Sequence, residues 1–140
     1  DSERGYLDAE FQDLLSEIDR ISDTTEFNGV TLLDGSLTVD IQVGIGTSTA
    51  DSINIAQSTD LDSTGIGVTG DITTSANAAT TMDQVIAAID TVSSARADFG
   101  AVQNRLEVSI RNIHNTSENL SAANSRIRDV DIASETAGEQ

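Results

Sequence analysis

The residues from 82 to 131 read MDQVIAAIDTVSSARADFGAVQNRLEVSIRNIHNTSENLSAANSRIRDVD. A large apolar residue recurs there at every seventh position, and a smaller residue follows three places after each. The large residues are Val85, Val92, Phe99, Leu106, Ile113, Leu120 and Ile127, and the smaller ones are Ala88, Ala95, Val102, Ser109, Thr116, Ala123 and Val130. A heptad pattern of this length predicts one helix of about 75 Å, at 1.5 Å per residue, whose apolar seam packs against other helices.

A second amphipathic helix is predicted at the start of the chain, over residues 1–22. Its apolar residues alternate in steps of four and three. They are Leu7, Phe11, Leu14, Ile18 and Ile21. We expect this helix to dock antiparallel on the long one and to cover less than half of the seam. The uncovered remainder implies a further segment or another subunit.

Turn and strand signals separate the two helices. Asn28-Gly29 indicates a tight turn, and residues 37–43 alternate apolar and polar side chains as a half-buried strand does. Residues 52–56 predict a shorter second strand, which makes a hairpin with the first. The segment 57–81 is rich in Ser, Thr, Gly and Asp and predicts an irregular connector, with one weak strand near 67–69.

These elements predict a single domain over residues 1–140. It has a helix at 1–22, a β-hairpin and loops at 23–80 and the long helix at 81–132. The fold class is α+β and mainly α: an elongated rod of antiparallel coiled-coil helices with a small β-hairpin.

The composition narrows the partners. The formal net charge is -17, and all seven basic residues are arginine. No basic residue occurs between Arg20 and Arg96, whereas ten acidic residues do. Nucleic acid and anionic membranes are therefore disfavoured partners. The absence of cysteine excludes disulfides, thiolate zinc sites and cysteine nucleophiles.

No residue pattern indicates catalysis or a cofactor. Asp60, Asp62, Thr64, Gly65 and Asp71 echo a calcium loop, but the twelfth position is Asp rather than Glu, and an acidic surface loop is the favoured interpretation. The lone His114 follows a seam residue and is expected at the surface. We expect no enzyme activity, no metal and no cofactor.

Several strings resemble bacterial flagellin. Residues 17–29, EIDRISDTTEFNG, followed by LLDG at 32–35, are similar to the end of the family's second N-terminal helix. The string IQVG at 41–44 resembles its hairpin strand. The strings SSARADFGAVQNRLE at 93–107 and SENLSAANSRIRDVD at 117–131 resemble its C-terminal core helix.

The resemblance implies a fragment of the core rod of a self-assembling structural subunit of the bacterial motility filament, which is exported and extracellular. It implies that both terminal regions and the family's first long N-terminal helix lie outside this chain. Other flagellin subunits and flagellar export chaperones are the implied partners. The alternative in the same organelle is a hook–filament junction protein.

The resemblance also implies recognition by Toll-like receptor 5. Glu10 and Arg105 fall at positions where the family has receptor-contacting residues. A surface protein that acts mainly as an innate-immune receptor ligand or adhesin is therefore a further alternative.

Overall fold

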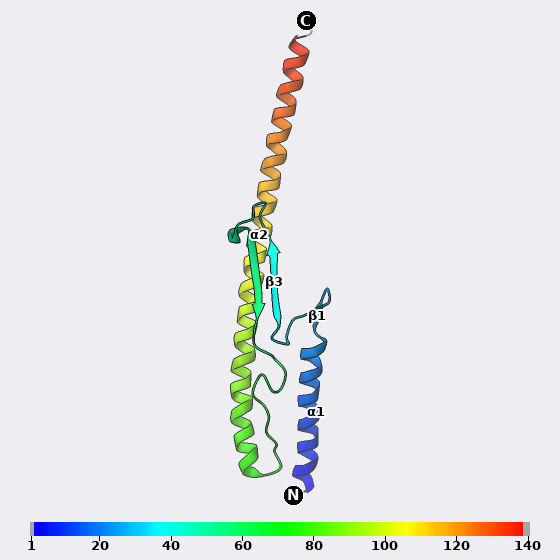
Figure 1. Cartoon of the computed structure of the whole chain (residues 1–140), viewed down its shortest axis with the longest axis vertical. Helices are drawn as coiled ribbons and strands as arrows, with labels where there is room; N and C mark the ends of the chain where they lie inside the picture. The colour runs from blue at the N-terminus through cyan, green and yellow to red at the C-terminus, as the bar shows by residue number, and fades with distance from the viewer. Residues whose placement is uncertain (1, 139–140) are drawn as a thin grey trace. The chain divides into compact units, whose positions relative to one another are not determined.

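The computed structural model describes residues 2–138, with side chains described as far as residue 128. The predicted seam residue Val130 lies outside the described side chains. The described residues form a mainly α structure of the α+β class, as predicted. Its elements are α1 (Ser2–Thr24), β1 (Glu26–Phe27), β2 (Val30–Thr31), β3 (Leu37–Gln42), a 3-10 turn (Thr49–Asp51), β4 (Ser52–Gln57) and α2 (Ser75–Gly138) (Figure 1).

The helix α2 begins six residues before the predicted position 81. Thr74 precedes its first turn, and the Thr74 hydroxyl accepts a hydrogen bond from the Asn77 N–H at 3.1 Å. A threonine there satisfies one of the free N–H groups that every helix start carries. Gly100 lies inside the helix without ending it, as expected from a cost of about 1 kcal/mol relative to alanine.

The chain divides into two compact units. Unit 1 consists of residues 1–41 and 54–102, and unit 2 consists of residues 42–53 and 103–140. Unit 1 therefore holds α1, the connector and the first part of α2. Unit 2 holds the loop between β3 and β4 and the rest of α2.

The connector between β4 and α2 forms the centre of unit 1. It runs between α1 and the first part of α2 (Figure 1), and its side chains meet those of both helices. The buried cluster consists of Leu15, Ile66, Val68 and Ala88, with Phe11, Ile18, Leu61, Val85 and Val92 packed against it. Fully burying a large apolar side chain contributes about 1.5–3 kcal/mol, so burial of this cluster stabilises unit 1.

In unit 1, α1 and the first part of α2 run parallel, so the predicted antiparallel docking is wrong. Arg4 and Leu7 share a pocket with Ala78 and Met82, whereas Ile18, later in α1, lines a groove with later residues of α2. Figure 1 shows both helices starting at the same end of unit 1. The reason is the connector, which runs back along α1 before α2 begins.

Two short antiparallel sheets complete the fold, one of β1 and β2 and one of β3 and β4. Asn28 and Gly29 both have positive φ, 53° and 76°, as the turn between β1 and β2 requires, so the predicted turn is confirmed. The predicted hairpin of β3 and β4 is also confirmed. The weak strand near 67–69 is wrong, because the Val68 N–H donates to the Ser63 carbonyl within a turn.

Candidate interaction surface

One face of α1 holds the connector and a neighbouring segment by hydrogen bonds to their backbone. The side chains of this face follow one another at alternating intervals of four and three residues, so they form a stripe along the helix, which we call the docked stripe. The bonds join Asp8 Oδ1 to Ile72 N–H (2.8 Å), Gln12 Nε2–H to the Gly70 carbonyl (3.3 Å), Asp19 Oδ1 to Ser63 N–H (2.7 Å) and Ser22 Oγ–H to the Leu33 carbonyl (3.0 Å). Leu15 lies in the same stripe and is buried.

The sequence pattern did not reveal this docked stripe. Leu15 is its one large apolar residue, and the rest are polar side chains that look like a solvent-facing surface. The Leu14-Leu15 pair was the only available signal, because Leu15 does not fit the predicted apolar stripe.

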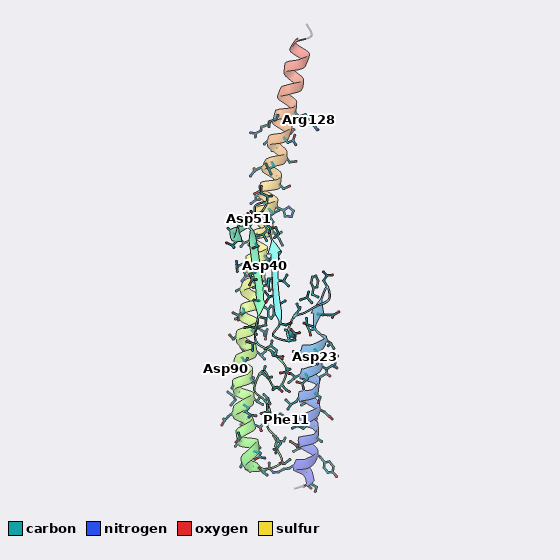
Figure 2. All side chains as sticks on the ribbon, in the orientation of Figure 1. Phe11, Asp23, Asp40, Asp51, Asp90 and Arg128 are labelled. Atoms are coloured by element: carbon teal, nitrogen blue, oxygen red, sulfur yellow. The ribbon has the colours of Figure 1, made fainter. Side chains whose placement is uncertain are left out.

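The predicted apolar stripe of α1 is only partly covered. Phe11, which is labelled in Figure 2, and Ile18 are half-buried against the core cluster. Leu7, Leu14 and Ile21, at intervals of seven, are 56%, 59% and 45% exposed. They therefore form an open apolar edge on α1, which we call the α1 edge, and their burial in a seam stays a prediction.

An apolar groove lies between this edge and α2 within unit 1. Leu14 lines one side and Ile89 lines the other, while Val68 of the connector also faces it. The volume of the groove is about 410 Å³. Ile89 is 59% exposed, which shows that the groove is open to solvent.

The seam of α2 changes from covered to open along its length. In unit 1, Ala88 and Ala95 are buried, and the large seam residues Val85, Val92 and Phe99 are half-buried. In unit 2, Leu106 is half-buried. The last three large residues are exposed: Ile113 by 47%, Leu120 by 66% and Ile127 by 71%. We call these three the α2 edge.

A second groove, of about 580 Å³, lies within unit 2 between α2 and the loop that joins β3 and β4. Asp51 organises this loop, because its carbonyl accepts from the N–H groups of Val43 (2.7 Å) and Gly44 (2.9 Å). Its carboxylate accepts from the Ser48 N–H and so completes a capping box. The loop presents Ile45 fully to solvent beside Ile113 and Leu120.

The two edges lie in opposite charge environments. The α1 helix has seven acidic residues against two arginines, whereas the segment 105–128 of α2 has four arginines against two glutamates. Glu3, Glu10 and Glu17 recur every seven residues beside the α1 edge. Glu17 accepts two hydrogen bonds from the Arg20 guanidinium, at 2.5 and 2.8 Å, and this pairing lowers the pKa of Glu17.

The two predicted receptor-contact residues lie in different units. Glu10 is exposed on α1 in unit 1. Arg105 is exposed on α2 in unit 2, where it lines a pocket of about 380 Å³ with Ile53 and Val108. Their role in receptor binding stays a prediction.

The remaining sequence candidates are polar surface features. The Asp60 and Asp62 carboxylates accept hydrogen bonds from the Asp62 and Gly65 N–H groups of their own turn. His114 is exposed on α2. Among the residues that the structure describes, no three His, Cys, Asp or Glu side chains gather in a way that could hold a metal. No helix in that part of the chain is both long and apolar enough to cross a lipid bilayer.

Comparison with known proteins identifies the family to which the chain belongs. The bacterial flagellin N-terminal helical region matches residues 1–38, and the bacterial flagellin C-terminal helical region matches residues 82–138. YvzB of Bacillus subtilis strain 168, a flagellin-type protein, is 45% identical over 125 residues, which cover 87% of the chain and 78% of that relative. The chain belongs to the bacterial flagellin family.

Two further relatives indicate how much of a flagellin the chain represents. A flagellin of Halalkalibacterium halodurans is 42% identical over 137 residues, which cover 96% of the chain and 50% of the relative. The flagellar filament 30.7 kDa core protein of Treponema maltophilum is 33% identical over 159 aligned positions, which cover 96% of the chain and 52% of the relative. The chain thus spans about half the length of these two relatives.

Proposed function

We propose that the protein is a structural subunit of the bacterial flagellar filament, which assembles with other flagellin subunits. The observation that carries this proposal is the match to both helical regions of the family, on a chain whose helices carry open apolar edges. In a subunit that works by packing against neighbours, such edges are expected to be buried on assembly.

The proposed work of the protein is mechanical rather than catalytic. Its relatives include a flagellin and a flagellar filament core protein. We propose a role in the extracellular filament, with no catalytic step, and with flagellar export chaperones as partners before assembly.

Immunogold electron microscopy of the source bacterium tests this proposal directly. An antibody raised against this chain is expected to decorate the flagella along their whole length. Decoration confined to the base of each filament would instead support the alternative of a hook–filament junction protein. Flagella without any label, in cells that contain the protein, would contradict both assignments. A strain with the gene deleted controls for cross-reaction of the antibody with other flagellins.

Receptor recognition is a second proposed function. Glu10 and Arg105 are both exposed, so a large partner can reach them without unfolding either unit. A reporter cell line that expresses Toll-like receptor 5 is expected to respond to the chain and to lose the response with Glu10→Ala combined with Arg105→Ala. The matched control combines Asp13→Ala with Arg111→Ala, since these residues are also exposed on α1 and α2. An equal response from the two variants would exclude the assigned contacts.

A further inference from the structure

The chain has two sites at which an Asn or Asp residue precedes a glycine. Asn28-Gly29 joins β1 to β2, and Asp34-Gly35 follows β2. Both glycines have a positive φ, of 76° and 73°. A glycine has no Cβ to shield its backbone nitrogen, so this nitrogen can approach the side chain that precedes it. Both pairs are therefore candidates for a reaction between side chain and backbone.

The pair at the β1–β2 turn lies in open surroundings. Asn28 and Gly29 are both exposed, and a Cβ built at Gly29 would meet nothing within 4 Å. Among residues 2–138, no group holds the Asn28 amide by a hydrogen bond. The two strands pair over two residues each, and a ladder this short opens at little cost in free energy. The Asn28 Cγ can therefore reach the Gly29 nitrogen while the rest of unit 1 stays folded.

The second pair is fixed in both side chain and backbone. The Asp34 carboxylate accepts hydrogen bonds from the Thr31 hydroxyl at 2.5 Å, the Ser36 hydroxyl at 2.7 Å and the Ser36 N–H at 3.0 Å. These bonds lower the pKa of Asp34, so the group stays an ionised carboxylate, which is a poor electrophile. A Cβ at Gly35 would lie 2.9 Å from the Asp60 nitrogen, so the backbone there has little room to move.

We propose that Asn28 is a site of spontaneous deamidation and that Asp34 is protected from the corresponding isomerisation. The Gly29 backbone nitrogen attacks the Asn28 Cγ and forms a C–N bond, while its proton passes through water to the leaving amine. The bond from Cγ to Nδ2 breaks and ammonia leaves, which gives a five-membered succinimide. Water then opens the ring at either carbonyl and yields aspartate or isoaspartate. Water is the co-reactant, and no oxidant or reductant takes part.

The other seven asparagines of the chain lack this reactivity. None of them precedes a glycine. Asn54 precedes Ile55 in β4, where the branched side chain shields the backbone nitrogen, and the remaining six lie in α2. A helix fixes the backbone dihedral angles and engages the following N–H in its own hydrogen bonds. We therefore expect fast deamidation at the β1–β2 turn alone.

Deamidation changes the surface around this turn. Both products carry a carboxylate in place of the amide, so the net charge becomes more negative than -17. Isoaspartate also adds a methylene to the main chain, which a two-residue turn with two positive φ angles does not accommodate. The side chain of Phe27, 76% exposed beside the turn, is then presented differently. Old and newly made copies of the protein should differ at this surface, and this modification is independent of the function proposed above.

Peptide mapping by mass spectrometry tests the proposal on the whole folded chain. The chain is kept at mildly alkaline pH, which favours loss of the Gly29 proton, and parallel samples are kept in urea. Asp34→Asn places a second Asn-Gly pair in the fixed site, so both sites then share one chemistry. We expect folding to slow deamidation by less than about threefold at position 28 and by more than about tenfold at position 34.

Two further variants serve as controls. Asn28→Gly keeps a sequence suited to this turn but removes the amide, so the mass gain of its peptide should disappear. Asn28→Asp creates a second Asp-Gly pair and is compared with Asp34 of the same chain, which needs no change at the fixed site. An isoaspartate-specific methyltransferase with labelled S-adenosylmethionine then counts the isoaspartate in each peptide. We expect at least about tenfold more at position 28 than at position 34.

Three results would overturn the inference. They are a folded chain in which position 28 is slowed as strongly as position 34, equal rates at the two positions in the folded chain, and an asparagine of α2 that deamidates as fast as Asn28. The first would mean that the β1–β2 turn stays closed in solution. The second would mean that the hydrogen bonds to Asp34 give no protection, and the third that α2 opens as readily as the turn.

Discussion

The first part of α2, in unit 1, and its later part, in unit 2, have the same heptad pattern but differ in how far the apolar seam is buried. Ala88, in the first part, is 5% exposed, whereas Leu120, in the later part, is 66% exposed. The difference lies in what covers each part rather than in the helix itself. Over the first part, α1 and the connector supply a core, and over the later part the seam faces solvent. A heptad pattern thus identifies the face that a helix uses, but not the partner that occupies it.

The strongest test of this comparison places a charge at one heptad position in each part. Ala88 and Ala123 are five heptads apart and occupy the same position in the pattern. Ala88→Asp is expected to cost about 3–5 kcal/mol of unfolding free energy, because it buries an unpaired charge in the core cluster. Ala123→Asp, on the exposed part, is expected to cost less than about 1 kcal/mol.

Urea denaturation followed by circular dichroism measures both variants. Helix propensity changes equally in the two, so their difference isolates the effect of burial. Equal losses would mean that α2 unfolds as one cooperative element whose later part is covered in solution. That outcome would remove the contrast between the two parts.

The second test concerns how closely the backbone of unit 1 is packed. Gly35 has a φ of 73°, and a Cβ at this position would lie 2.9 Å from the backbone nitrogen of Asp60. Gly35→Ala is therefore expected to destabilise unit 1 by about 1–3 kcal/mol, from backbone strain and the contact together. Gly100→Ala is the control of opposite sign, because this helical position meets nothing within 4 Å. It is expected to stabilise by about 0.5–1 kcal/mol.

Thermal unfolding distinguishes these two glycine variants by the sign of the change in Tm. Asp34 and Asp60 pair in an isolated antiparallel β-bridge. A Gly35→Ala variant as stable as the parent would show that the backbone at this bridge is not closely packed. The hydrogen bonds from α1 and the buried cluster would then hold the connector in place without help from this backbone contact.

These contrasts explain which features the sequence could predict. The helices, the Asn28-Gly29 turn and the β3–β4 hairpin follow from local patterns, and all are present. The direction of α1 does not follow, because an amphipathic stripe looks the same from either end. The position of the connector could not be predicted either, because Asp8, Gln12 and Asp19 bind its backbone, and backbone groups leave no pattern in a sequence.

The interaction surface was predictable to a similar degree. The uncovered part of the seam follows from the lengths of the two helices and is present as the α2 edge. The apolar pattern placed Leu14 in a helix seam, so its exposure was not predicted. Predicting that exposure required knowing which side of α1 the connector occupies. Whether an apolar side chain is buried depends on which segment packs over it, and that depends on the fold of the whole chain.

The third test uses pH to loosen the connector. The Ser63 N–H hydrogen bond holds the pKa of Asp19 below its ordinary value of 3.8, and the Thr73 hydroxyl does the same for Asp71. A carboxylate with a lowered pKa stabilises the fold above pH 3.8, and that stability is lost as the pH falls through the lowered pKa. We therefore expect the Tm of unit 1 to fall as the pH drops below about 4.

Replacing the carboxylate separates Asp19 from the general effect of acid. Asp19→Asn is expected to lower stability by about 1 kcal/mol at pH 7, the low end for a hydrogen bond to a charged group, because the side chain is partly exposed. It should also reduce the dependence of Tm on pH below 4. An unchanged pH profile would assign the acid effect to the other carboxylates of the chain.

The smallest effect is expected for Glu17, two residues before Asp19. Its carboxylate pairs with Arg20 on the exposed face of α1, where both side chains are more than half exposed. Solvent and salt screen such a pair, and ordering two long side chains offsets most of its attraction. Glu17→Gln should therefore leave the Tm at pH 7 unchanged within error, although the pKa of Glu17 is lowered as that of Asp19 is. A loss equal to that of Asp19→Asn would mean that the charge on this face, rather than the tie to the connector, holds α1 in place.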